Sequence, residues 1–120
     1  MRHRTLGKST LSVSAVGLGC MAMSGVYGPA DDAESIAVIH HALAQGINHL
    51  DSADMYGWGH NEELIGRALK GRRAGVVVAT KVRVPQGEFG RIADAVTNSL
   101  EGSLARLRLN RVDILHLHNP

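Results

Sequence analysis

The order of hydrophobic and polar residues divides the chain into short apolar runs and longer segments of helical periodicity. The short runs predict strands at residues 15–19, 47–50, 76–79 and 112–118. The run at 76–79 is continuous and mostly β-branched, which is typical of a strand covered on both faces. A polar, glycine-containing turn between two short apolar segments predicts a hairpin over residues 4–13.

Between these runs, three segments carry apolar residues at the spacing of an amphipathic helix. The first is expected to begin at Asp31 or the residue after it and to end before Gly46, since glycine often follows a helix C-terminus. The second is expected to begin with Asn61 as its cap and to end at Gly71. The third spans residues 91–108. Its expected buried stripe consists of Ile92, Val96, Leu100, Leu104 and Leu107.

The predicted order is a hairpin followed by alternating strands and helices, βαβαβαβ. Such alternation favours a parallel sheet with right-handed crossovers. Two architectures satisfy this order, an open doubly wound sheet and a (β/α)₈ barrel. In both of them, functional groups gather at the carboxyl ends of the strands.

Four reactive side chains lie at or just beyond the ends of the predicted strands. Asp51 ends the second strand, and Tyr56 lies in the loop that follows it. Lys81 ends the third strand and His118 ends the fourth. The sequence therefore predicts that a carboxylate, a phenol, an amine and an imidazole meet at one rim of the sheet.

This set of side chains suits proton transfer to a carbonyl oxygen. A phenol ordinarily has a pKa of about 10, and a nearby ammonium lowers it. Asp51 would hold Lys81 in its charged form, Lys81 would tune Tyr56 as a general acid, and His118 could hydrogen-bond the oxygen that receives the proton. A cofactor would supply the hydride. The set predicts reduction of a carbonyl group.

Composition narrows the class of protein. The 120 residues are 44% apolar and 20% charged, with a net charge of +2, which is typical of a globular domain. Lys and Arg form no basic patch interleaved with aromatic residues, so we expect no nucleic-acid binding. No run is long enough to span a membrane. Cys20 is the only cysteine, so no internal disulfide can form, and we expect a cytoplasmic location.

Seven short motifs then carry a family resemblance. They are residues 17–21, 27–28, 51–57, 61–66, 79–81, 103–107 and 112–118. Together, and in this order, they resemble the aldo/keto reductases, and the match runs from the hairpin to the last residue. The Gly-Cys-Met-Ala-Met-Ser stretch also resembles the bacterial and plant branch often described as auxin-induced or pyridoxal-reductase-like proteins.

The resemblance implies a TIM barrel of which residues 1–120 form the N-terminal part of a single domain, with the hairpin closing its bottom. It implies reduction of aldehydes or ketones with NADPH, bound without a Rossmann domain. The catalytic tetrad carries over onto Asp51, Tyr56, Lys81 and His118, all unsubstituted. The expected cofactor contacts are Gly19, Cys20, Met21 and Asp51. The expected substrate contacts are Met21, Tyr56, Trp58 and His118.

Length is the main departure from the family. A (β/α)₈ barrel typically needs about 250 residues, and the family's phosphate- and adenine-binding residues come from later strands and loops. An alternative function is therefore a non-catalytic truncated or split fragment. A half barrel would leave sheet edges open, so self-association or docking of a complementary C-terminal half is expected.

Two other interpretations of the motifs are weaker. His116 and His118 share one face of a strand, but no further ligands are placed for a metal, so no metal site is predicted and His116 is interpreted as a packed interior histidine. The pattern Gly17-x-Gly19-x-x-Ala22 fits the loose dinucleotide fingerprint, which must open a helix directly. Here a loop at 24–29 intervenes, which argues against a Rossmann domain.

Overall fold

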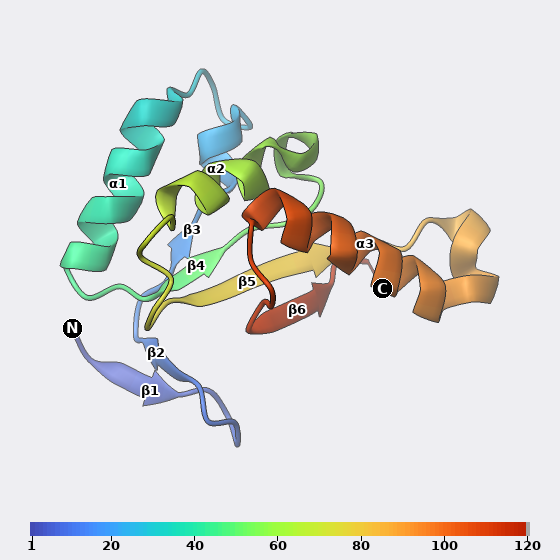
Figure 1. The fold of residues 1–120 in the computed structure, drawn as a ribbon, viewed down its shortest axis with the longest axis horizontal. Coiled ribbons are helices and arrows are strands. Elements are labelled where there is room, and N and C mark those ends of the chain that lie inside the picture. Colours follow the sequence, from blue (N-terminus) through green and yellow to red (C-terminus); the bar gives the residue numbers. More distant parts are fainter. Residues whose placement is uncertain (120) are drawn as a thin grey trace.

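A parallel sheet in the strand order β3-β4-β5-β6 organises the chain (Figure 1). The structure is a computed structural model, and it describes residues 1–119. The strands are β3 (Leu18–Gly19), β4 (His49–Asp51), β5 (Val77–Val82) and β6 (Ile114–Leu117). Because sequence order and spatial order coincide, the described sheet has no switch point at which strand order reverses.

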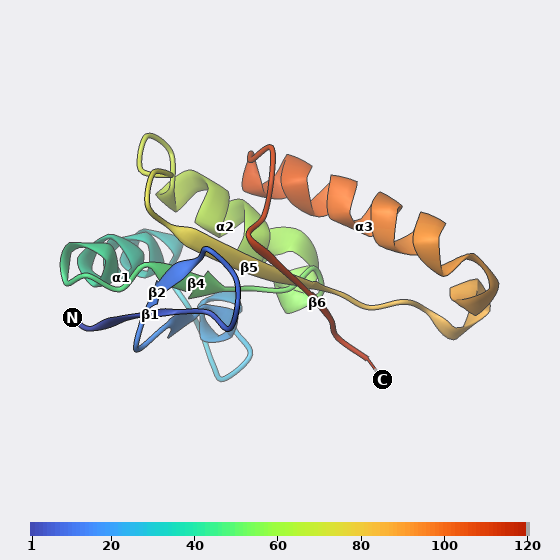
Figure 2. The same cartoon turned by 90° about the horizontal axis from the view of Figure 1, so that it is seen from below.

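The helices are α1 (Asp32–Ala44), α2 (His60–Ala68) and α3 (Ile92–Leu107). Short 3₁₀ segments, η1 (Met21–Ser24), η2 (Tyr56–Gly59) and η3 (Gln86–Arg91), connect the strands to them. Figure 2 shows α2 and α3 on the same side of β5 and β6.

All three helices pack on one face of the sheet. Ile39 of α1, Ile65 of α2 and Leu107 of α3 form one buried cluster with Leu50 of β4 and Val78 of β5. Leu50 and Val78 are register partners, so their side chains point to the same face. A doubly wound sheet would carry helices on both faces. The one-sided packing therefore favours the barrel over the open sheet.

The predicted hairpin is confirmed, and it extends one residue further at each end than expected. β1 (His3–Thr5) pairs antiparallel with β2 (Ser12–Ser14). Asn48, just before β4, joins the hairpin to the sheet, since its side chain accepts from the Ser14 N–H at 2.7 Å and donates to the Ser12 carbonyl at 2.9 Å. The hairpin therefore lies at the amino ends of the strands, opposite the rim that carries the tetrad (Figure 1).

Three predicted strands were too long at their ends. Before β3, residues 15–17 do not pair with β4, because the Ala15 N–H donates to the Arg2 carbonyl at 2.8 Å and keeps this segment with the hairpin. The strand predicted at 47–50 begins two residues later, at His49, and β4 includes Asp51. Of the strand predicted at 112–118, only the residues of β6 are in a strand. The central strand β5 is buried along nearly its whole length, as its continuous apolar run predicted.

The prediction for α1 is confirmed at both ends. The Asp31 side chain accepts a hydrogen bond from the Glu34 N–H at 3.0 Å and caps the helix. Gly46 follows the helix with a φ of +93°, the left-handed conformation that glycine adopts most readily.

The prediction for α2 was wrong at both ends. The helix begins at His60 after Gly59, whose φ is +104°, and it ends at Ala68 instead of Gly71. Asn61 does not cap it. Its side chain is fully buried and hydrogen-bonded to the loops after β3 and β4, so tertiary contacts take the groups that a cap would use.

The predicted buried stripe of α3 is only partly buried. Leu107 is completely buried, whereas Val96, Leu100 and Leu104 are half-buried. Ile92 is 51% exposed, because the first turn of α3 projects past the end of β5 (Figure 1). The helix thus packs on α2 and the sheet mainly through its second half.

Candidate active site

Three of the predicted catalytic side chains meet at the carboxyl ends of β4 and β5. The Lys81 Nζ donates to Asp51 Oδ2 at 2.7 Å and to the Tyr56 hydroxyl at 3.0 Å. It also donates to the Ser52 carbonyl at 2.8 Å. The three donated bonds use the full donor capacity of an ammonium group. Lys81 therefore has a fixed position between the carboxylate and the phenol.

Strand register explains this arrangement. Asp51 pairs with Ala79, so Lys81, two residues beyond Ala79, points to the same face of the sheet. That face is opposite to the one on which Leu50 and Val78 meet the helices. The tetrad therefore faces what is the interior side of a barrel.

His118 joins the site from the end of β6. The backbone N–H of His118 donates to the Val82 carbonyl at 2.8 Å, which extends the strand pairing by one residue. The rings of His118 and Tyr56 make an edge contact, with centroids 6.0 Å apart. The Nδ1 atom of His118 is buried and has no hydrogen-bond partner among residues 1–119. The imidazole therefore lies beside the phenol, and its Nδ1 atom is available for a further hydrogen bond.

His116 does not occupy the packed interior position expected from the sequence. It is the register partner of Lys81 on β6, and it is exposed. Since β6 is the last strand of the described sheet, no further strand covers it.

A sharp turn in η2 directly follows Tyr56. Gly57, Trp58 and Gly59 all have positive φ, at 59°, 52° and 104°. Such a run is unusual and costly for Trp58, which is not a glycine. The turn leaves Trp58 85% exposed on the loop. Trp58 is thus close in sequence to the site without a buried contact in it.

The electrostatic environment keeps Lys81 charged. Burial of Lys81 works against its charge, but the hydrogen bonds to Asp51 and Tyr56 outweigh burial and raise the pKa of Lys81 above its ordinary value. The Lys81 Nζ also lies 4.8 Å from the centre of the Tyr56 ring. An ammonium at this position stabilises negative charge on the phenolic oxygen.

The predicted cofactor contacts are divided between the two faces. Gly19 is the register partner of Asp51 and is exposed. Met21 begins η1 and is half-buried. The thiol of Cys20 points into the hydrophobic core and is fully buried. Burial, followed by the charge of Asp51, raises the pKa of Cys20 to about 12, so the thiol stays neutral in the core.

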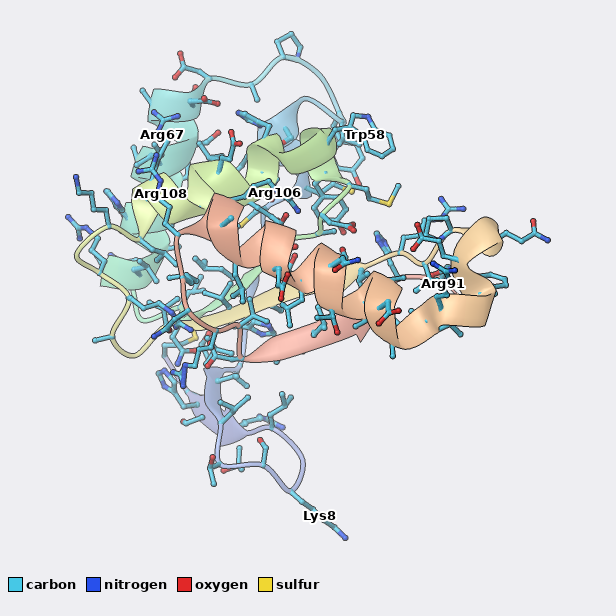
Figure 3. All side chains as sticks on the ribbon, turned by 45° about the vertical axis from the view of Figure 1, so that its right-hand side comes forward. Lys8, Trp58, Arg67, Arg91, Arg106 and Arg108 are labelled. Atoms are coloured by element: carbon cyan, nitrogen blue, oxygen red, sulfur yellow. The ribbon has the colours of Figure 1, made fainter. Side chains whose placement is uncertain are left out.

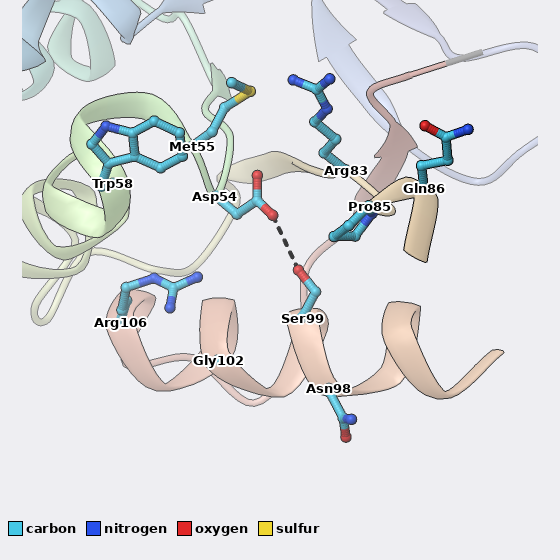
Figure 4. A pocket seen from close by; sticks show the side chains of 10 residues that line it. All are labelled: Asp54, Met55, Trp58, Arg83, Pro85, Gln86, Asn98, Ser99, Gly102 and Arg106. Carbon is cyan, nitrogen blue, oxygen red and sulfur yellow. Dashed lines mark hydrogen bonds between the residues drawn. The ribbon is translucent and has the colours of Figure 1, made fainter. Parts of the chain in front are cut away.

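A hollow lies between α3 and the loops after β4 and β5 (Figure 4). Its wall includes Trp58, Arg83 and Arg106, and Ser99 donates to Asp54 at 3.1 Å. None of the tetrad residues lines it. Figure 3 shows Arg106 near Trp58, whereas Lys8 lies far away at the tip of the hairpin.

Sequence reasoning missed the buried polar residues behind the tetrad. Glu62 is fully buried and bonds to Thr80 Oγ1 at 2.7 Å and to Arg106 Nε at 2.8 Å. Asn61 accepts from Ser52 Oγ at 2.6 Å. The available signal is the motif at 61–66, whose first residue, Asn61, has the pattern of a helix cap.

Comparison with known proteins decides the family. Residues 15–120 match the sequence model of the aldo/keto reductase family. The chain belongs to the aldo/keto reductase family. It is 36% identical to an uncharacterized oxidoreductase of Bacillus subtilis, YqkF, over 98% of this chain and 39% of that protein. It is 38% identical to a Schizosaccharomyces pombe protein named aldo-keto reductase yakc [NADP(+)], over 96% of this chain and 36% of that protein.

Solved aldo-keto reductases confirm the fold. The holo form of an enzyme from Bacillus halodurans superposes with a TM-score of 0.83 at 37% identity, over 98% of this chain and 40% of that one. A Klebsiella pneumoniae enzyme in complex with NADPH gives a TM-score of 0.76 at 32% identity, over 89% of this chain and 36% of that one. The chain thus has the partial TIM-barrel fold of this family and spans about two fifths of the length of these relatives.

Among residues 1–119, no helix combines the length and the apolar character needed to cross a membrane.

Proposed function

We propose that this aldo/keto reductase chain takes part in the NADPH-dependent reduction of aldehydes or ketones to alcohols. The observation that carries the proposal is the Lys81 ammonium, bonded at once to the Asp51 carboxylate and the Tyr56 hydroxyl. This is the arrangement that a phenolic general acid requires.

The chain's own residues supply the proton and stabilise the charge left behind. Tyr56 would give its hydroxyl proton to the substrate oxygen, and the phenolate formed would accept a hydrogen bond from Lys81. Asp51 holds that ammonium in place. His118, beside the Tyr56 ring, would donate a hydrogen bond to the same substrate oxygen. NADPH, when bound, supplies the hydride.

The open face beside Asp51 fits the nicotinamide end of the cofactor. A Cβ atom built on Gly19 would meet no atom within 4 Å, so space is free next to Asp51 on the tetrad side. Gly19, Met21 and Asp51 would border the ring, whereas the Cys20 thiol faces the core. The name of the fission-yeast relative and the NADPH complex of the Klebsiella enzyme support the choice of NADPH.

The proposal includes a partner for the open sheet. β3 and β6 are the outer strands of the described sheet, and Leu117 on β6 is 61% exposed. A complementary barrel half would pair with these edges and cover this side chain, since unpaired edges recruit further strands. A cytoplasmic location also belongs to the proposal, because the single cysteine is held as a buried thiol.

NADPH oxidation by the purified 120-residue chain against a panel of aldehydes tests the proposal. We expect Tyr56→Phe to lower turnover by about a hundredfold or more, the size of a general-acid contribution. Tyr27→Phe is the matched control, because Tyr27 is 77% exposed and outside the tetrad, and it should leave turnover unchanged.

The opposite result favours the alternative function. If no variant oxidises NADPH and the cofactor's fluorescence does not change on titration with the chain, the tetrad does not work in this chain alone. The chain would then be a non-catalytic fragment that requires its partner.

A further inference from the structure

Asn61 occupies a fully buried position between the ends of two strands. Its Nδ2 donates to the Cys20 carbonyl at 2.7 Å, just after β3. Its Oδ1 accepts from Ser52 Oγ at 2.6 Å, just after β4. The side chain is completely inaccessible to solvent. One amide therefore joins the first helical turn of α2 to the loops that follow β3 and β4.

A second step leads from this amide to the tetrad. The carbonyl of Ser52, whose hydroxyl bonds to Asn61, accepts the third hydrogen bond of Lys81 at 2.8 Å. Any shift of Ser52 therefore moves an acceptor of the ammonium that holds Tyr56. The same amide fixes the Cys20 backbone, which lies between Gly19 and Met21 on the proposed cofactor side.

A third group of contacts extends the network to the surface. Asn61 Nδ2 also donates to Ser24 Oγ at 3.0 Å, and Ser24 Oγ bonds to His60 Nδ1 at 2.7 Å. His60 Nε2 bonds to Asp32 at 2.8 Å, which lowers the pKa of Asp32, and Arg67 contacts the same carboxylate.

A row of hydrogen-bonded side chains, Ser24, His60 and Asp32, has the order of a nucleophilic triad. Their packing indicates a structural role instead. A Cβ atom at Gly57 would lie 3.0 Å from Ser24 Oγ, so the turn that carries Tyr56 already covers the hydroxyl. Ser24 is thus held between η1 and η2 and has no room for a substrate on that side.

We infer that Asn61 is a positioning residue for the proposed reduction, holding the cofactor side of the rim and the Lys81–Tyr56 pair at a fixed separation. This inference rests on the proposed function. Asparagine is required because the position needs a donor toward the Cys20 carbonyl and an acceptor toward the Ser52 hydroxyl. Aspartate has the same shape but no donor, and its charge would be buried against a carbonyl oxygen.

The test uses Asn61→Asp with two readouts that need no turnover. The first is the rate at which a thiol reagent modifies Cys20 under native conditions, which reports opening of the loop after β3. We expect a rise of about tenfold or more beyond any change in global unfolding, since a buried donor to the Cys20 backbone is lost.

The second readout follows Tyr56 directly. In a Tyr27→Phe background Tyr56 is the only tyrosine, so the NMR signals of an isotope-labelled tyrosine ring report its surroundings at neutral pH. We expect Asn61→Asp to shift or broaden these signals, because Ser52, which joins position 61 to Lys81, moves with it. A residue that only stabilises the fold would change unfolding and leave these signals in place.

Asn98→Asp is the control, because Asn98 is exposed on α3 and the substitution is chemically the same. If Cys20 labelling and the NMR signals of Tyr56 are the same in Asn61→Asp and Asn98→Asp, the inference is overturned. Because neither readout involves NADPH, an inactive parent chain would reject the proposed function and leave this test intact.

Discussion

Cys20 and Lys81 lie at the carboxyl ends of β3 and β5, on either side of β4, but in opposite surroundings. The thiol is turned into the aliphatic core, where burial and Asp51 raise the pKa of Cys20 to about 12. The amine is turned to the tetrad face, where hydrogen bonds to Asp51 and Tyr56 raise the pKa of Lys81 despite partial burial. Both groups therefore stay protonated at neutral pH, one as a neutral thiol and the other as an ammonium.

The stability of the chain should decline at alkaline pH because of Cys20. An unfolded thiol has a pKa of about 8.5, and the folded one has a pKa of about 12. The folded state therefore binds more protons between these values. The contribution of the Cys20 thiol to the free energy of unfolding is complete below its unfolded pKa. This contribution is lost as the pH rises toward its folded pKa.

Urea unfolding of the parent chain and Cys20→Ala, at about pH 7 and about pH 10, measures this effect. The variant should be less stable at neutral pH because of the cavity, yet lose less stability on going to alkaline pH. Comparing the two chains cancels the titration of the other groups. Equal losses in both chains would contradict the prediction.

At the scale of elements, the contact between α2 and α3 depends on a glycine. A Cβ atom at Gly66 would lie 2.6 Å from the Leu107 carbonyl oxygen and 2.9 Å from that of Arg106. Both are backbone atoms, so neither can move aside without displacing the end of α3. Close approach of the helices in turn lets Arg106 reach the buried carboxylate of Glu62.

Gly66→Ala should therefore destabilise the chain by about 1–3 kcal/mol through overpacking. Gly102→Ala is the matched control in α3, since a Cβ atom there would meet only the guanidinium of Arg106, the mobile end of a side chain, at 3.1 Å. In the control, the better helix propensity of alanine, worth about 1 kcal/mol, should offset that contact. Similar losses in both variants by chemical unfolding would count against the proposed close approach.

At the scale of the whole molecule, the two faces of the sheet differ. The helices bury one face, and the tetrad faces the other. On the outermost strand, Leu115 and Leu117 share the helix side with Thr80 and Val82, yet they are 36% and 61% exposed. An apolar strand edge in this state is a surface for association.

The 120-residue chain should therefore associate as its concentration rises. Leu117→Lys places a charge on the edge and should lower the mean mass measured by light scattering after size exclusion. Val38→Lys is the control, because Val38 is 44% exposed but lies on α1, away from the edge. A well-dispersed monomer with cooperative unfolding would contradict this prediction.

The order of the elements, the family and the list of reactive side chains follow from the sequence. Asp31 and Gly46 marked the ends of α1 because capping chemistry is local. Asp51 and Lys81 could be placed at one rim because parallel strands bring their carboxyl ends together.

The contacts, direction and exposure of those side chains depend on the tertiary structure. Asn61 has the sequence signal of a helix cap, but its partners come from loops 9 to 41 residues away, and they keep it in the interior. The direction of the Cys20 thiol and the exposure of His116 depend on which face the helices cover and on which strand lies outermost. Local patterns cannot specify these features, because each is set by contacts between segments that are distant in the sequence.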